Sequence, residues 1–86
     1  MKPVRLSRHA QGYTAKRGFT VAEIERAIRE GPWSPAEYGE GRLQASMEFP
    51  FQAIWNGRRY AVKRVRPIFV ELELEILVIT VYTYYY

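Results

Sequence analysis

The residues best suited to acid–base chemistry lie near the N-terminus. His9 is the only histidine in the chain, and histidine is the side chain that exchanges a proton near neutral pH. Tyr13 and Arg17 follow at intervals of four residues, so on a helix the three side chains would form one slowly drifting stripe. Cleavage of RNA by its own 2′-hydroxyl needs a base, an acid for the leaving oxygen, and cations on the phosphate. The stripe is one candidate for such a site. The alternative is that His9 only hydrogen-bonds the start of the fold and Arg17 only favours a helix C-terminus.

Positive charge is concentrated in two stretches without acidic residues, 1–20 and 58–66, in a chain of net charge +4. Two such stretches suit an anionic partner, and phosphate is the commonest one. Arginine adds forked donors that match phosphate oxygens. The alternatives are an ordinary solvated surface, or an edge strand that uses cations to prevent edge pairing. The predicted nucleic-acid-binding residues are Arg8, Lys16, Arg58, Arg59, Lys63, Arg64 and Arg66.

Four tyrosines stand at or near the end of the sequence, at positions 82, 84, 85 and 86. Their rings could stack on bases, or one could present a phenol to a reaction. The alternative interpretation is that part of this segment packs as the end of an amphipathic strand.

Several other chemistries are excluded. One histidine and no cysteine leave too few ligands for zinc and no disulfide. The glycines match neither a P-loop nor a dinucleotide fingerprint, and no serine lies in a nucleophile-elbow pattern. We therefore expect no metal and no cofactor.

Length and composition predict a single domain over residues 1–86. Chains of this size bury about 60–65% of their unfolded surface, and a hydrophobic content of 48% is not typical of disorder. The basic N-terminus leads into no apolar segment of signal-peptide length. The longest apolar run, 76–82, is too short to cross a bilayer as a helix. We expect a cytoplasmic protein without membrane association.

Two helices are predicted, over about 8–17 and 20–30, after a short leading strand at 4–6. Ser7 is a typical N-cap, and Gly18 suits the left-handed position that ends a helix. Thr20 and Glu23 have the spacing of a capping box. Gly31-Pro32 should end the second helix, and residues 33–40 read as a loop.

The sheet is predicted over about 42–84. Alternating apolar residues from Leu43 to Phe49 indicate a strand with one wet face, and Pro50 should break it or form a bulge. Asn56-Gly57 is a strong hairpin signal. We expect a turn near Pro67 and one long final strand from 69 to 84. The resulting fold class is α+β, with two N-terminal helices packed on a C-terminal antiparallel sheet of three to four strands.

The segment Ser7-Arg8-His9-Ala10, followed by Arg17-Gly18-Phe19-Thr20, resembles a family of small bacterial proteins of unknown function. The N-terminal pattern of that family has His-Ala, an arginine four residues on, then Arg-Gly and a capping Ser or Thr. Its final strand is similar to residues 78–82 here. His9 and Arg17 match the first motif, while Tyr13 stands where the family has an arginine.

This family is similar to the RelE/ParE-type toxin superfamily. The resemblance therefore implies the fold of that superfamily. Ribonucleases of that superfamily cut RNA without a metal, using basic side chains and often a tyrosine near the C-terminus. The resemblance thus implies His9, Arg17 and Tyr82 as candidate catalytic residues.

Three functions remain open from the sequence. The first is a metal-independent endoribonuclease of a toxin–antitoxin pair, acting on RNA or at the ribosome and neutralised by an acidic antitoxin protein. The second is a non-catalytic nucleic-acid-binding module, which the tyrosine at position 13 favours. The third is a protein-interaction domain that forms a homodimer through its C-terminal strand.

Overall fold

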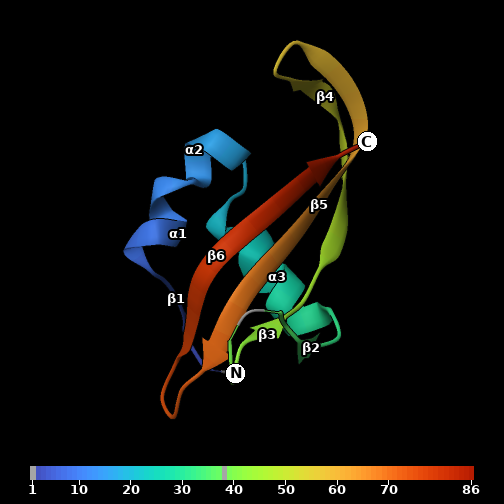
Figure 1. The fold of residues 1–86 in the computed structure, drawn as a ribbon. Helices are drawn as coiled ribbons and strands as arrows, with labels where there is room; N and C mark the ends of the chain where they lie inside the picture. The colour runs from blue at the N-terminus through green and yellow to red at the C-terminus, as the bar shows by residue number, and fades with distance from the viewer. Residues whose placement is uncertain (1, 38) are drawn as a thin grey trace.

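Two long antiparallel strands form the centre of the computed structural model, which describes residues 2–37 and 39–86. They are β5 (Arg58–Glu71) and β6 (Ile76–Tyr85), and the turn between them is closed by the Leu72 N–H, which donates to Glu75 O at 2.8 Å. Both strands cross the whole molecule in Figure 1. The molecule is elongated, with extents of 41 × 24 × 23 Å.

Short strands extend this pair on both sides. β1 (Val4–Leu6) pairs in parallel with the start of β6. On the other side, β3 (Leu43–Gln44) and β4 (Met47–Trp55) both pair antiparallel with β5, and β2 (Ser34–Pro35) pairs with β3. The strand order β1-β6-β5-β3-β2, with β4 also on β5, makes one mixed six-stranded sheet of the described residues.

Three short helices lie beside and behind this sheet (Figure 1). Ser7 caps α1 (Arg8–Gly12) by accepting from Ala10 N. α2 (Thr14–Arg17) follows directly and ends at Gly18, which has the left-handed φ of 73°. α3 (Val21–Glu30) begins with the capping box of Thr20 and Glu23, which satisfies two of its free backbone donors.

The hydrophobic core lies between α3 and one face of the sheet. α3 contributes Ile24, Ala27 and Ile28, which recur at the spacing of one helical face. From the sheet, Val65, Phe69 and other apolar side chains are buried against them. One face of the sheet is therefore covered. The core residues from the strands are Leu6, Phe49, Val65, Phe69, Ile76, Val78 and Val81, and Ala45 joins them from the segment between β3 and β4.

The expected fold class is wrong, because the described residues form a six-stranded mixed sheet with three short helices rather than two helices on three to four antiparallel strands. The sheet is mixed because the leading strand pairs in parallel with residues 76–78 and satisfies the hydrogen-bonding groups of their backbone. The expected helix over 8–17 divides at Tyr13, whose N–H bonds Ala10 O at 3.2 Å in a tighter turn. Gly12 precedes that division and is a weak helix former.

The turn expected near Pro67 is also wrong. Pro67 lies inside β5 opposite Val81, next to a register shift between Ile68 and Phe69, where a residue without an N–H is tolerated. The real turn at 72–75 divides the expected final strand. By contrast, Asn56 and Gly57 have positive φ (50° and 79°) as predicted.

Candidate nucleic-acid interface

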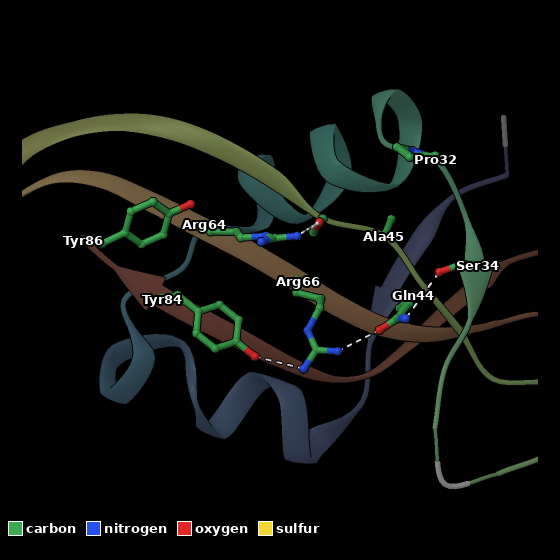
Figure 2. Close-up of a pocket in the computed structure, with 9 residues that line it drawn as sticks. Pro32, Ser34, Gln44, Ala45, Arg64, Arg66, Tyr84 and Tyr86 are labelled. Atoms are coloured by element: carbon green, nitrogen blue, oxygen red, sulfur yellow. Dashed lines mark hydrogen bonds between the residues drawn. The ribbon is translucent and has the colours of Figure 1, made fainter.

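The sheet face opposite α3 carries arginine and tyrosine side chains. Successive side chains along a strand lie on opposite faces of the sheet. Arg64 and Arg66 therefore lie on the face opposite to that of Val65, which is in the core. The register sets Arg64 beside Tyr84 and Arg66 beside Tyr82. In Figure 2 α3 lies behind the strands of this face, while α1 and α2 lie along its lower edge. We call it the open face and define it by Gln44, Ser46, Arg64, Arg66, Tyr82, Tyr84 and Tyr86.

Two guanidinium groups lie near the ring of Tyr82 on the open face. The guanidinium carbon of Arg66 lies 4.9 Å from the ring centroid, and that of Arg17 lies 5.2 Å from the same centroid. Arg17 comes from α2 and donates to Val81 O at 2.7 Å, whereas Arg66 comes from β5. One cation of α2 and one of β5 thus each lie against the same tyrosine ring.

The contacts continue from Tyr82 to His9. The guanidinium of Arg17 also lies 3.9 Å from the ring centroid of Tyr13, and Tyr13 packs edge-on against His9 with centroids 4.7 Å apart. Lys16 adds a second cation, 5.6 Å from the Tyr13 centroid. His9 is exposed. The three residues that the resemblance implies therefore lie along one row, in which Tyr13 is the connecting residue.

A groove lies beside this row and is shown in Figure 2. It has a volume of about 590 Å³, which is within the range of small-molecule sites. Arg66 is fixed across it, because one Nη donates to Gln44 Oε1 at 2.7 Å and the other to the Tyr84 hydroxyl at 2.9 Å. Arg64 donates to Ser46 Oγ at 3.1 Å. The groove is lined by Pro32, Ser34, Gln44, Ala45, Ser46, Arg64, Arg66, Tyr84 and Tyr86.

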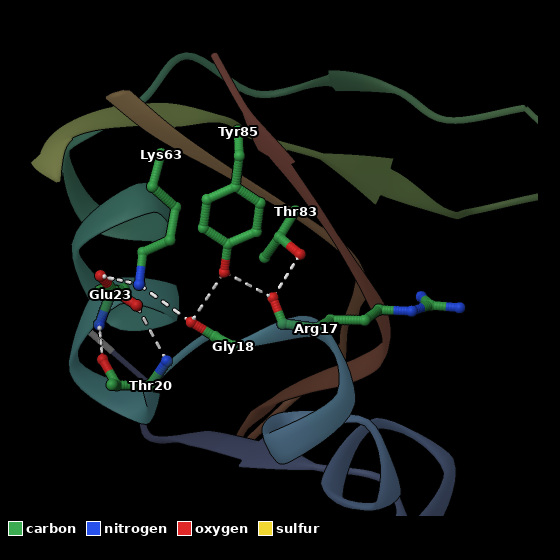
Figure 3. A network of polar contacts seen from close by, with 7 residues as sticks. All are labelled: Arg17, Gly18, Thr20, Glu23, Lys63, Thr83 and Tyr85. Carbon is green, nitrogen blue, oxygen red and sulfur yellow. Dashed lines mark hydrogen bonds and ion pairs between the residues drawn. The ribbon is translucent and has the colours of Figure 1, made fainter. Parts of the chain in front are cut away.

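Lys63 takes no part in this surface, although it was predicted to bind nucleic acid. Its side chain is buried on the covered face, where Nζ lies 2.8 Å from a carboxylate oxygen of Glu23 and donates to Gly18 O at 2.9 Å (Figure 3). Lys63 is thus a structural residue. A buried charge needs such a partner, because desolvation without one costs several kcal/mol.

The covered face also positions Arg17. Its carbonyl oxygen accepts hydrogen bonds from the hydroxyls of Thr83 at 2.5 Å and Tyr85 at 2.9 Å. Figure 3 shows these bonds on one side of Arg17 and its side chain extending away from them. The backbone of α2 is held by one face of β6, so the guanidinium can reach the Tyr82 ring on the other.

These contacts also occupy the outer edge of β6. Ser7 Oγ donates to Ile79 O at 2.9 Å and Arg17 donates to Val81 O, while β1 pairs with residues 76–78. The strand through which we expected a second copy to pair therefore lies between β5 and the N-terminal segment.

The remaining predicted residues lie outside the Arg17–Tyr82–Arg66 contact. Arg58 and Arg59 are exposed at the tip of the β4–β5 hairpin, which extends beyond the end of β6 in Figure 1. Arg58 lies 5.8 Å from the ring centroid of Tyr60. Arg8 is exposed, one residue before His9.

Sequence reasoning missed three polar residues of the groove, Ser34, Gln44 and Ser46. For Gln44 and Ser46 a signal was present, since they occupy the wet side of an alternating strand. For Ser34 there was none, because it reaches the groove through the pairing of β2 with β3. The amide of Gln44 joins the two strands by donating to Ser34 Oγ at 3.3 Å.

The last two tyrosines titrate differently from free tyrosine. Burial raises the pKa of Tyr85, and the nearby carboxylate of Glu23 raises it further. Burial also raises the pKa of Tyr86, with the nearby carboxylate of Glu48 as a further cause. Both phenols therefore stay protonated to a higher pH than a free tyrosine.

Comparison with protein-family models, with curated proteins and with solved structures finds no match. The resemblance to the toxin-like family stays a prediction. Among residues 2–37 and 39–86, no group of three or more His, Asp and Glu side chains could hold a metal ion. In the same part of the chain, no helix is long and apolar enough to cross a membrane.

Proposed function

We propose that the chain is an RNA-contacting module that binds the phosphate backbone on its open face. The observation that carries the proposal is the approach of Arg17 and Arg66 to the same tyrosine ring. Each guanidinium brings a full positive charge and forked donors to the surface around this ring. Phosphate oxygens of a bound strand can accept from either of them.

The distribution of ion pairs supports the same surface. In the part of the chain that the structure describes, the cations that pair with carboxylates are Lys2, Arg5, Arg26 and Lys63. None of them belongs to the open face. Arg17, Arg64 and Arg66 instead donate to neutral carbonyl, amide and hydroxyl oxygens. Their positive charge is left for a partner, while exposed tyrosine rings beside them suit bases.

The test is the salt dependence of binding to a fluorescein-labelled single-stranded RNA, measured by anisotropy. We expect Arg66→Gln and Arg64→Gln each to weaken binding about fivefold and to reduce the slope of log K against log salt by about 0.7. Arg29→Gln removes the same charge from exposed α3 on the other side of the sheet and should change neither quantity. Equal losses in all three variants would count against the open face.

A metal-independent ribonuclease is the second candidate, favoured by the exposed position of His9 at the end of the row through Tyr13 and Arg17 to Tyr82. In this form of the proposal, His9 is the proton-transfer group, Arg17 holds the phosphate and Tyr82 lines the site. An acidic antitoxin would cover the same arginines, and a cytoplasmic location belongs to the same proposal.

Incubation of labelled RNA with the protein in EDTA separates the two candidates. A ribonuclease would cut the RNA, and His9→Gln would abolish the cutting without weakening binding. RNA that is bound but left intact by the wild-type protein supports the non-catalytic module.

A further inference from the structure

We propose that the groove of the open face holds two consecutive nucleotides of a single strand, with one base stacked on Tyr84 and the next on Tyr86. The proposal rests on the RNA-contacting function above and names the form of RNA that the surface takes. It is carried by the spacing of the rings, the placement of the arginines and the size of the groove.

The spacing of the rings requires a strand whose bases are unstacked. Tyr84 and Tyr86 are alternate residues on one face of a strand, so their Cα atoms lie about 6.8 Å apart. Bases in a helical strand follow one another at about 3.4 Å. One base can therefore stack on each ring only where the chain is opened, as it is in single-stranded RNA.

Both rings are available for stacking. Tyr84 is 42% exposed and Tyr86 is 52% exposed, and in Figure 2 both are seen with a ring face toward the viewer. The Tyr84 ring is held in place by its hydroxyl, which accepts from Arg66. Tyr82 differs, because the guanidiniums of Arg17 and Arg66 already lie at its ring.

The arginines lie beside the Tyr84 ring, where they can reach the phosphate next to the base that stacks on it. Arg64 stands directly across from Tyr84 in the sheet register. Its one side-chain hydrogen bond in the described chain goes to Ser46, so most of its five donors remain for a phosphate. Arg66, held by Gln44 and Tyr84, adds a fixed positive charge.

The groove has room for a short segment of this kind. Its volume of about 590 Å³ matches sites for ligands of nucleotide size. A duplex, in contrast, turns its base faces inward and offers the groove only phosphates.

The experiment compares a fluorescein-labelled oligouridine of eight nucleotides with an RNA duplex of eight base pairs, by anisotropy at fixed low salt. We expect the single strand to bind about tenfold more tightly than the duplex, although the duplex carries more charge. Tyr84→Ala and Tyr86→Ala should each weaken single-strand binding about tenfold, within the usual range for loss of a base–aromatic stack. Neither should change duplex binding.

Tyr86→Phe is the matched control, since it keeps the ring and should retain single-strand binding to within about twofold. Circular dichroism of every variant checks that it is folded. Equal affinity for the two RNAs, or alanine variants that bind like the wild type, overturns the two-nucleotide groove while salt-dependent binding through Arg64 and Arg66 stands. Failure of the wild-type protein to bind either RNA overturns the proposed function itself.

Discussion

Lys63 and Arg64 are neighbours in β5, yet the two faces of the sheet use them in different ways. Lys63 is buried against Glu23 and the Gly18 carbonyl, whereas Arg64 is exposed and bonds only a serine hydroxyl among the described residues. The same contrast separates Tyr85, which donates to the Arg17 carbonyl, from Tyr84 and Tyr86 on the open face. One face uses its cation and phenol to hold the fold together, and the other leaves similar groups exposed to solvent.

The largest change in stability is expected from a substitution that removes contacts of the covered face alone. Lys63→Met keeps an apolar stem but leaves the Glu23 carboxylate and the Gly18 carbonyl without their partner. We expect the free energy of unfolding to fall by about 3 kcal/mol in urea titrations. Arg64→Met, on the open face, should change it by less than about 0.5 kcal/mol. Similar losses in the two variants would mean that the faces do not differ as described.

Gly18 gives the next largest effect, because its backbone lies against the covered face. A Cβ on Gly18 would lie 2.7 Å from ring atoms of Trp55 and closer still to the Tyr85 hydroxyl, at a φ of 73°. Gly18→Ala should therefore lower the unfolding free energy by about 2 kcal/mol.

Gly12→Ala is the matched control for Gly18→Ala, since a Cβ there meets nothing within 4 Å. It should raise stability by about 0.5 kcal/mol through helix propensity. Thermal unfolding of both variants checks the difference in sign.

A smaller effect, about 1 kcal/mol, is expected at Tyr85. Tyr85→Phe removes the hydroxyl that donates to Arg17 O and should lower stability at neutral pH by that amount. Tyr84→Phe removes a hydroxyl that accepts from Arg66 on the exposed face and should cost less than about 0.5 kcal/mol. Urea titrations of the pair measure the difference.

The same two variants should differ in alkaline solution. Burial and Glu23 raise the pKa of Tyr85 above its usual value of 10.0. The unfolded chain then releases the Tyr85 proton at lower pH than the folded chain. Its contribution to stability is fully present below pH 10.0 and is lost as pH rises through the higher folded pKa. Stability should fall less steeply above that pH in Tyr85→Phe than in Tyr84→Phe, and parallel curves would contradict this cause.

Local patterns predicted the parts of the fold that local physics decides. The Asn56-Gly57 turn, the cap of Ser7 and the Thr20–Glu23 box are each set within four residues, and each is confirmed. Alternation along β5 also agrees with the opposite faces on which Lys63 and Arg64 lie.

Long-range contacts could not be read in the same way. Nothing in the N-terminal segment indicates that it pairs in parallel with residues 76–78. Nor can alternation alone tell which face of a strand a helix will cover, so Lys63 and Arg64 were both expected to bind. His9, Arg17 and Tyr82 were predicted as catalytic residues, and that role stays a prediction. Tyr13, taken as a lost cation, is the ring that joins His9 to Arg17.

The smallest expected effect on RNA binding tests whether Glu48 partly neutralises the positive charge of Arg64 on the open face. Glu48 stands across from Arg64 in the sheet register, and its carboxylate contributes to the raised pKa of Tyr86. It therefore competes with phosphate for Arg64 and for the phenol of Tyr86. Glu48→Gln should tighten binding to the single-stranded oligouridine about twofold at low salt. The gain should disappear near 1 M salt, where the Debye length falls to about 3 Å.

Glu73→Gln removes the same charge from the exposed 72–75 turn, at the far end of β6 from Tyr84, and serves as the control. If both variants tighten binding equally, the gain comes from the change in net charge. Arg64 is then not the cation that contacts the phosphate in the groove. If only Glu48→Gln tightens binding, the phosphate lies beside Arg64. The two faces then differ because Lys63 has its anionic partner within the fold, whereas Arg64 finds its anionic partner in the phosphate of a ligand.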